Sequence, residues 1–136
     1  MGRIKAREGL VSFIFQREFN KDENDSLQLF VENFEYTEEE TKFIVESSVM
    51  LLENLSVIDD IIESNLNKWS MDRLFKIDLS ILRVAVFELL YNKDTAKEIV
   101  INEAVEIAKK FGTEESPKFV NGILGSLIRS EKISLN

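Results

Sequence analysis

The chain has 136 residues, of which 44% are hydrophobic and 31% charged, and its formal net charge is −8. This length and balance indicate one globular domain that can bury a core without disulfides or metals, and exclude a disordered chain. Cysteine and histidine are absent, which excludes a disulfide framework, a thiolate nucleophile, and the commonest general base and metal ligand. Five glycines and one proline are too few for the tight turns of an all-β fold.

The charge is unevenly distributed along the chain. Residues 1–19 carry four basic and two acidic groups, whereas residues 20–66 carry two basic and thirteen acidic groups. An acidic run usually marks a solvated face, and the basic N-terminus is better suited to phosphates. No apolar run approaches the ~18 residues needed to cross a bilayer. We therefore expect a cytoplasmic protein without a membrane partner.

Apolar spacing predicts helices from the start of the chain. Residues 3–19 place apolar side chains at the i, i+3, i+4 spacing of one helical face. The polar run over 20–25 ends this helix, and Ser26 can cap a short second helix that continues through Phe34.

A capping box marks the next helix. Thr37 is followed by three glutamates, so its hydroxyl can accept the N–H of Glu40 while the Glu40 side chain reaches back. A second start signal over residues 56–59 indicates that the long helical stretch divides near Asn54.

Residues 74–91 are apolar almost all round, which predicts a helix in the middle of the protein. Arg83 and Glu88 interrupt this pattern, and a buried charge is costly unless it is paired. We expect each side chain either to reach the surface or to satisfy backbone groups. The alternative is that one end of this helix is exposed as a partner surface.

Two further amphipathic helices complete the pattern. Residues 97–111 form the first, and Gly112 ends it. Ser116 is expected to be the N-cap of the second, with Pro117 at its first position, and this helix runs to about Lys132. In the first of the two, the inward residues should be Ile101, Ala104, Val105, Ala108 and Phe111.

Together these signals predict an all-α protein of about seven helices joined by short loops, in one domain over residues 1–136. The chain has no glycine-rich phosphate loop, no serine elbow and no metal-ligand spacing. The adjacent acidic residues at 59–60 and at 114–115 would point about 100° apart on a helix, so neither pair forms a carboxylate dyad. We therefore expect no enzyme and no cofactor.

Two segments could contact nucleic acid. Arg3, Lys5 and Arg7 on the first helix could meet phosphates, although a solvated helix start explains them equally well. The stretch KFVNG at 118–122 combines a cation, an aromatic ring, an amide and a glycine. These groups suit stacking and hydrogen bonding to a single-stranded base. The alternative is that the aromatic ring is core and the glycine permits close helix packing.

Three separated segments resemble the NusB family. They read LRVAVFEL at 82–89, INEAVEIAKKFG at 101–112 and KFVNGIL at 118–124. Their order and spacing match the family, as does the Arg-Glu pair that enters the first apolar helix at 7–8. The resemblance implies two packed three-helix bundles. It further implies a transcription antitermination factor that pairs with the ribosomal protein NusE, binds the single-stranded boxA element of nascent ribosomal RNA transcripts, and acts in an RNA polymerase antitermination complex.

The resemblance also implies roles for individual residues. The family's basic N-terminal helix matches Arg3, Lys5 and Arg7, with fewer basic residues here. The aromatic RNA contact matches Phe119, between Lys118 and Asn121, which are expected to contribute to the same RNA-binding site. An acidic residue that faces NusE matches Asp78, on a segment expected at the surface. These RNA-binding and partner-binding residues are Arg3, Lys5, Arg7, Lys118, Phe119, Asn121 and Asp78.

Other functions remain open on the sequence alone. The runner-up is a helical protein–protein adaptor of the same fold without an RNA role, and a homodimer that masks the RNA surface is a further option. The resemblance also extends to the RNA-binding domain of some ribosomal RNA methyltransferases. Because the sequence shows no attached catalytic domain, we expect the free-standing factor.

Overall fold

The computed structural model describes residues 3–19, 35–66 and 70–130, and within these ranges it contains helices and no strand. This confirms the all-α prediction. The short helix expected at 26–34 lies outside the described residues. The elements are α1 (Arg3–Arg17), α3 (Glu38–Glu53), α4 (Leu55–Glu63), the 3-10 helix η1 (Met71–Arg73), α5 (Lys76–Tyr91), α6 (Lys97–Phe111) and α7 (Ser116–Arg129).

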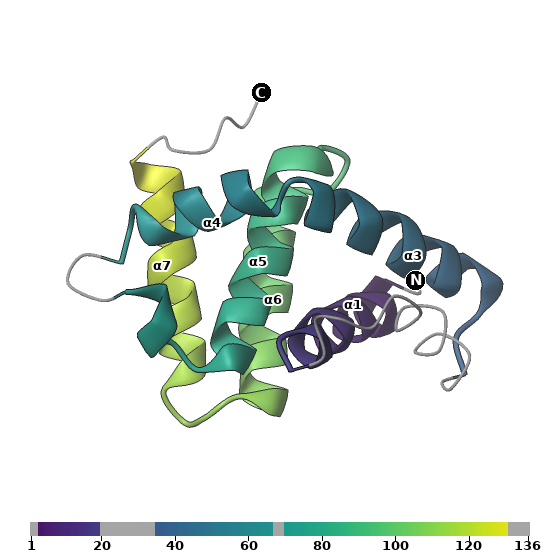
Figure 1. The fold of residues 1–136 in the computed structure, drawn as a ribbon, viewed down its shortest axis with the longest axis horizontal. Coiled ribbons are helices and arrows are strands. Elements are labelled where there is room, and N and C mark those ends of the chain that lie inside the picture. The colour runs from purple at the N-terminus through teal and green to yellow at the C-terminus, as the bar shows by residue number, and fades with distance from the viewer. Residues whose placement is uncertain (1–2, 20–34, 67–69, 131–136) are drawn as a thin grey trace.

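Helix α5 lies at the centre of the molecule, between two groups of helices (Figure 1). On one side α1 packs against α3 and α5, and on the other α6, α7 and α4 pack around α5. All residues of α5 from Asp78 to Leu89 are buried. Its lack of a polar face, visible in the sequence, is therefore explained by neighbours on all sides.

Two local signals in the acidic half of the chain, the capping box at Thr37 and the division near Asn54, agree with the structure. The N–H of Glu40 donates to Thr37 Oγ1 over 3.0 Å, and the N–H of Thr37 donates to Glu40 Oε1 over 2.8 Å, completing the capping box. Helix α3 ends at Glu53, and the side chain of its C-cap residue Asn54 donates to the Met50 carbonyl over 2.8 Å. The predicted division between α3 and α4 is therefore confirmed.

Three expectations near the last two helices need correction. Phe111 was expected to point inward but is 46% exposed, because it lies in the last turn of α6, whereas Ile107 one turn earlier is buried. Ser116 is the first residue of α7 and not its cap. Its Oγ accepts the N–H of Thr113 over 2.9 Å, so it stabilises the turn before the helix. Helix α7 ends at Arg129, and Lys132 lies outside the described residues.

The charges on α5 are paired inside the protein, which corrects the expectation that they reach the surface or bond the backbone. The Arg83 guanidinium donates to both carboxylate oxygens of Asp59, over 2.9 and 3.0 Å, and to Glu18 over 2.5 Å. Glu88 is 1% exposed and accepts a 2.8 Å hydrogen bond from Nε of Arg7. These contacts connect α5 to α1 and α4, and the exposed end of α5 is its start, where Phe75 is 60% exposed.

Gly9 allows α1 and the segment around α3 to approach closely. A Cβ at this position would lie 2.6 Å from Tyr36 Oη and 2.8 Å from Ile44 Cδ1. Neither distance is compatible with a real contact, so the side chains opposite would have to move.

We predict that Gly9→Ala lowers the free energy of unfolding by about 1–3 kcal/mol, the usual cost of overpacking. This loss should outweigh the helix-propensity gain of about 1 kcal/mol that alanine brings. Gly122→Ala is the matched control, because its Cβ would meet nothing within 4 Å, and it should stabilise the protein. Urea unfolding measures both variants, and a Gly9→Ala protein as stable as the wild type would contradict the prediction.

Candidate macromolecular interface

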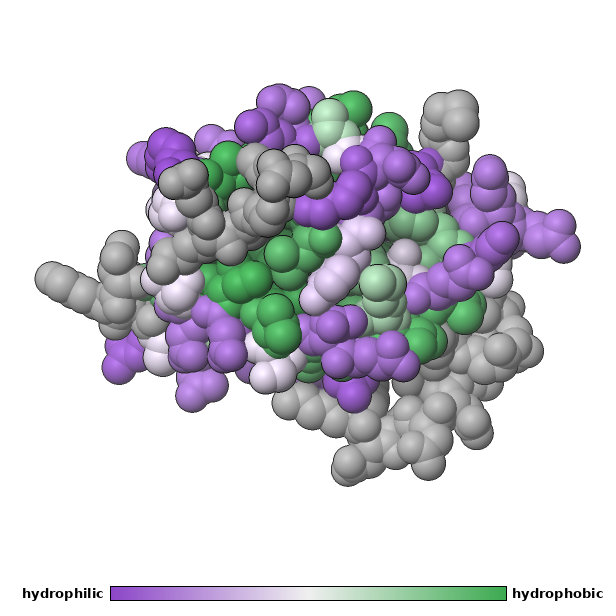
Figure 2. Space-filling model, turned by 90° about the horizontal axis from the view of Figure 1, so that it is seen from above, coloured by the Kyte–Doolittle hydropathy of each residue, from purple (hydrophilic) through white to green (hydrophobic). Residues whose placement is uncertain are grey.

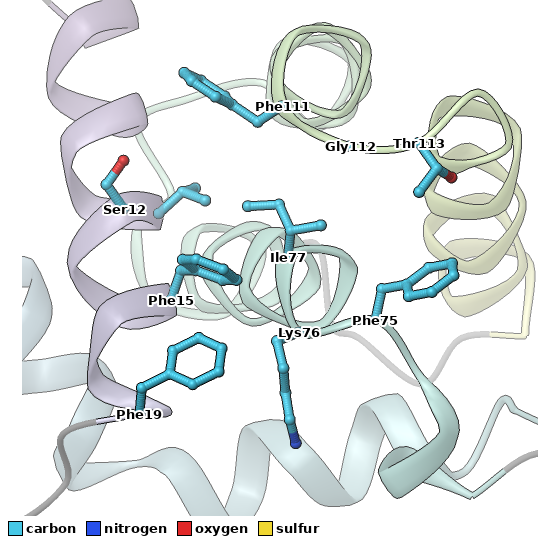
Figure 3. A pocket seen from close by; sticks show the side chains of 10 residues that line it. Ser12, Phe15, Phe19, Phe75, Lys76, Ile77, Phe111, Gly112 and Thr113 are labelled. Atoms are coloured by element: carbon cyan, nitrogen blue, oxygen red, sulfur yellow. The ribbon is translucent and has the colours of Figure 1, made fainter.

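An apolar groove lies where the end of α1, the start of α5 and the turn after α6 meet (Figure 3). Its volume is about 500 Å³. Figure 3 shows Phe15 and Ile77 pointing into the space between the three elements. The residues that line the groove are Val11, Ser12, Phe15, Phe19, Phe75, Lys76, Ile77, Phe111, Gly112 and Thr113.

Three phenylalanines of this groove are strongly exposed. Phe19 is 62% exposed, Phe75 60% and Phe111 46%. The Phe19 ring packs edge-on against Phe15, with 5.2 Å between ring centroids. Exposed aromatic rings gathered around a depression are typical of protein-binding surfaces, where such side chains anchor the partner.

A second, smaller cavity of about 230 Å³ adjoins the groove, because Phe75 and Thr113 line both. This cavity brings Asp78 of α5 and Phe119 of α7 together. The residue expected to face a protein partner and the aromatic expected to face RNA therefore share one cavity. Its full lining is Arg73, Leu74, Phe75, Asp78, Thr113, Glu115 and Phe119.

Asp78 is not at the surface, contrary to expectation. It is 5% exposed, and its buried Oδ1 has no hydrogen-bond partner among the described residues. Burial raises the pKa of this carboxyl above its ordinary value of 3.8, and a hydrogen bond from Ser116 partly opposes the shift. Replacing Asp78 by lysine would bury an ammonium group, so a neutral variant is the better probe of this site.

The predicted RNA-binding residues of α7 differ in exposure. Lys118 and Asn121 are exposed, and because they are three residues apart they lie on one side of the helix. Phe119 is half-buried and packs against the core with one part of its ring. The structure therefore gives this ring a packing role and leaves part of it accessible.

The basic residues of α1 are engaged within the protein. The Arg3 guanidinium stacks 4.4 Å from the centroid of the Phe43 ring, and Lys5 Nζ lies 5.5 Å from the Tyr36 ring and donates to the Glu35 carbonyl over 2.5 Å. Arg3 and Lys5 remain exposed, whereas Arg7 does not.

Arg7 is 5% exposed and its Nε is bonded to a buried carboxylate, so it has to be removed from the expected RNA surface. The remaining basic residues of α1 lie far from α7. In Figure 1 the two helices are on opposite sides, with α5 and α6 between them. The structure does not bring the two predicted nucleic-acid segments into one site.

The sequence did not predict the groove, because its most exposed rings lie at helix ends, where the periodic apolar pattern stops. Phe19 follows the last turn of α1, and Phe75 precedes the first turn of α5. For these two residues the available signal was a large aromatic side chain next to a helix boundary, outside the apolar stripe of the helix.

A further exposed apolar area lies on α3 and α4, which run along the top of Figure 1. Figure 2 looks down on that face and shows hydrophobic side chains gathered in its middle among hydrophilic ones. The exposed hydrophobic residues of these two helices are Val49, Met50 and Val57. Unlike the groove, this area has no aromatic ring among its exposed large hydrophobic residues.

The described ranges contain no group of three or more acidic side chains arranged to hold a metal ion. They also contain no helix with the length and hydropathy that a membrane span requires.

The buried Asp78 carboxyl predicts a pH dependence of stability. Because its pKa is raised in the folded state, the folded protein binds this proton more tightly than the unfolded chain does. The contribution of Asp78 to stability is therefore fully present at pH values below the ordinary pKa of the carboxyl. It is lost as the pH rises through the raised pKa that the carboxyl has in the folded protein. We expect Asp78→Asn to remove this loss. Relative to that variant, the wild type should become less stable between acidic and neutral pH.

Urea unfolding at several pH values measures this difference. Glu114→Gln serves as the control, since it neutralises an exposed carboxyl in the turn after α6. A stability difference between wild type and Asp78→Asn that does not change with pH would contradict the burial of this charge.

The chain is similar to known proteins of one family in both sequence and fold. The model of the NusB family matches residues 4–129. A transcription antitermination protein NusB from Clostridium novyi is 39% identical, over 96% of this chain and 100% of its own length. A NusB of the same description from Bacillus cereus is 41% identical, over 93% of this chain and 97% of its own length.

Solved structures agree with the sequence relatives. T. maritima NusB superimposes with a TM-score of 0.87 at 41% identity, covering 95% of this chain and 92% of that one. A structure of the antitermination factors NusB and NusE in complex with double-stranded RNA superimposes with a TM-score of 0.83 at 25% identity. The match covers 96% of this chain and 99% of that one. The match extends over nearly the full length in sequence and in fold, and the chain belongs to the NusB family.

Proposed function

We propose that this chain is an RNA-binding transcription antitermination factor. As a single domain in the cytoplasm, it would pair with the ribosomal protein NusE and bind boxA-type single-stranded RNA of nascent ribosomal RNA transcripts, within an RNA polymerase antitermination complex. The observation that carries the proposal is the apolar groove with its exposed phenylalanines, adjoining the cavity that contains Phe119. The proposed role is regulatory, in keeping with the relatives' description as antitermination proteins, and it requires no catalytic step, cofactor or membrane.

The groove is the part of the surface that we assign to the protein partner. Its exposed rings are apolar, and among its lining residues Lys76 alone is charged, which suits a protein segment better than a phosphate backbone. A related structure contains NusB together with NusE and RNA, and this supports a two-partner arrangement for a chain with two adjoining cavities.

The RNA surface is assigned to the start of α7. Phe119 offers part of its ring for stacking, while Lys118 and Asn121 can contact a phosphate and a base edge. Arg3 and Lys5 are accessible for further phosphates, but they belong to α1, which α5 and α6 separate from α7 (Figure 1). Binding by this chain alone should therefore rest on few cations and be strengthened when a basic partner is present.

One observation favours an adaptor without an RNA role. Three basic residues of the N-terminal helix are in contact with aromatic rings or a buried carboxylate of the protein itself. Salt dependence separates the two functions, because RNA affinity falls steeply with salt whereas an apolar protein contact does not. A second copy of the chain could also cover the groove, and the molar mass in solution tests for this homodimer.

The RNA prediction concerns Phe119. We expect Phe119→Ala to weaken boxA RNA binding by about 1–3 kcal/mol, the usual loss when a stacked base loses its aromatic partner. Phe111→Ala is the control, since it removes an exposed ring from the groove and not from α7. RNA titrations and thermal melts are measured on both variants. Unchanged RNA affinity combined with a large loss of stability in Phe119→Ala would show that the ring only packs the core.

The partner prediction concerns Phe75, which is 60% exposed and lines both cavities. Phe75→Asp places a charge in an apolar contact and should weaken NusE binding at least about tenfold, which corresponds to ~1.4 kcal/mol. The fold should be little affected, because the ring is mostly in solvent. Val57→Asp introduces the same charge on α4, at a residue 49% exposed, and should bind NusE normally. Calorimetric titration measures both affinities, and equal losses in the two variants would place the partner elsewhere.

A further inference from the structure

Glu18 lies just beyond α1, and its carboxylate is buried between two cations of α5. Its side chain is 8% exposed. One carboxylate oxygen accepts a 2.5 Å hydrogen bond from Nη1 of Arg83, and the other lies 3.6 Å from Nζ of Lys76. A carboxylate held in this way fixes the backbone that carries it, since moving it away would leave the Arg83 charge partly uncompensated.

The backbone that Glu18 fixes is the turn that carries Phe19. The N–H of Glu18 donates to the Phe15 carbonyl over 3.1 Å, and the N–H of Phe19 donates to the Gln16 carbonyl over 3.0 Å. The Phe19 ring then packs edge-on against Phe15. Both rings line the apolar groove, whereas Glu18 does not.

Arg83 has a second carboxylate partner that lies away from the groove. It makes two hydrogen bonds to Asp59 of α4, which is not among the groove residues. The same cation is thus paired with one acid that holds the end of α1 and with another that holds α4. This pair of acids allows the effect on the groove to be separated from the effect on overall stability.

We propose that Glu18 is a positioning residue of the docking groove. Through its ion pairs with Arg83 and Lys76 it holds the turn after α1 against α5 and so sets the place of the Phe15 and Phe19 rings, without touching the partner itself. This inference rests on the proposed function, in which the groove binds NusE.

Glu18→Gln tests the proposal, because it keeps the size of the side chain and removes its charge. NusE affinity should fall about tenfold. Asp59→Asn removes the other carboxylate charge that is paired with Arg83 but leaves the turn after α1 in place. The NusE affinity of this variant should therefore fall by less than about threefold. Urea unfolding shows how far each variant is destabilised, and equal losses of NusE affinity in the two variants would overturn the proposal. If Glu18→Gln does not fold, Glu18→Asp, which shortens the side chain by one methylene, replaces it. Its NusE affinity is again expected to fall by more than that of Asp59→Asn.

A double-mutant cycle with Phe19→Ala provides a measurement that a merely stabilising role would not change. If Glu18 acts through the Phe19 ring, adding Glu18→Gln to Phe19→Ala should weaken NusE binding by less than about twofold more. Additive losses would show that Glu18 acts by another route and would overturn the assignment.

Failure of the proposed function can be distinguished from failure of this inference. If the wild-type chain does not bind NusE at all, the proposed function is wrong. The positioning role is then read from the aromatic NMR signals of Phe15 and Phe19. These signals should shift in Glu18→Gln and stay in place in Asp59→Asn, and signals that are unchanged in both variants would overturn the inference.

Discussion

Two charged side chains in the middle of the central helix constrain how the other helices pack. Arg83 and Glu88 are buried on α5, where an uncompensated charge would cost several kcal/mol. Their partners come from different elements: Asp59 from α4, Arg7 from α1, and Glu18 from the turn after α1. A shift of α1 by one residue would move its atoms by about 1.5 Å along its axis, enough to break hydrogen bonds of this length. The ion pairs therefore fix the register of α1 and α4 on α5.

This arrangement changes what the basic residues of α1 can do. A charge used to compensate a buried carboxylate is not available to a phosphate, so Arg7 contributes to the fold and not to an RNA surface. Arg3 and Lys5 lie against aromatic rings near the start of α3 and stay accessible. The surfaces best suited to binding are then the apolar groove at the end of α1, with its exposed phenylalanines, and the exposed side of α7 around Phe119.

The helices were largely predictable, because their signals are local. The Thr37–Glu40 capping box formed as expected, the chain divides at Asn54, and the apolar run at 74–91 is the central helix. The site was predictable only in part. The exposure of Lys118 agrees with the predicted role, but Asp78 is buried, because the turn before α7 and the start of α5 cover it. The exposure of a residue at a helix end depends on the elements that pack next to it. The apolar pattern of one helix carries no information about those elements.

The sequence by itself determined the class of fold, several of the helix limits and the family resemblance, since caps, apolar periodicity and short motifs are properties of neighbouring residues. Only the tertiary structure decided which charges would meet. Arg7 and Glu88 are 81 residues apart in the chain, and Glu18 and Arg83 are 65 apart. No local pattern links such residues. The same holds for the groove, whose phenylalanines come from three helix ends and form one surface only because the buried ion pairs on α5 hold those ends together.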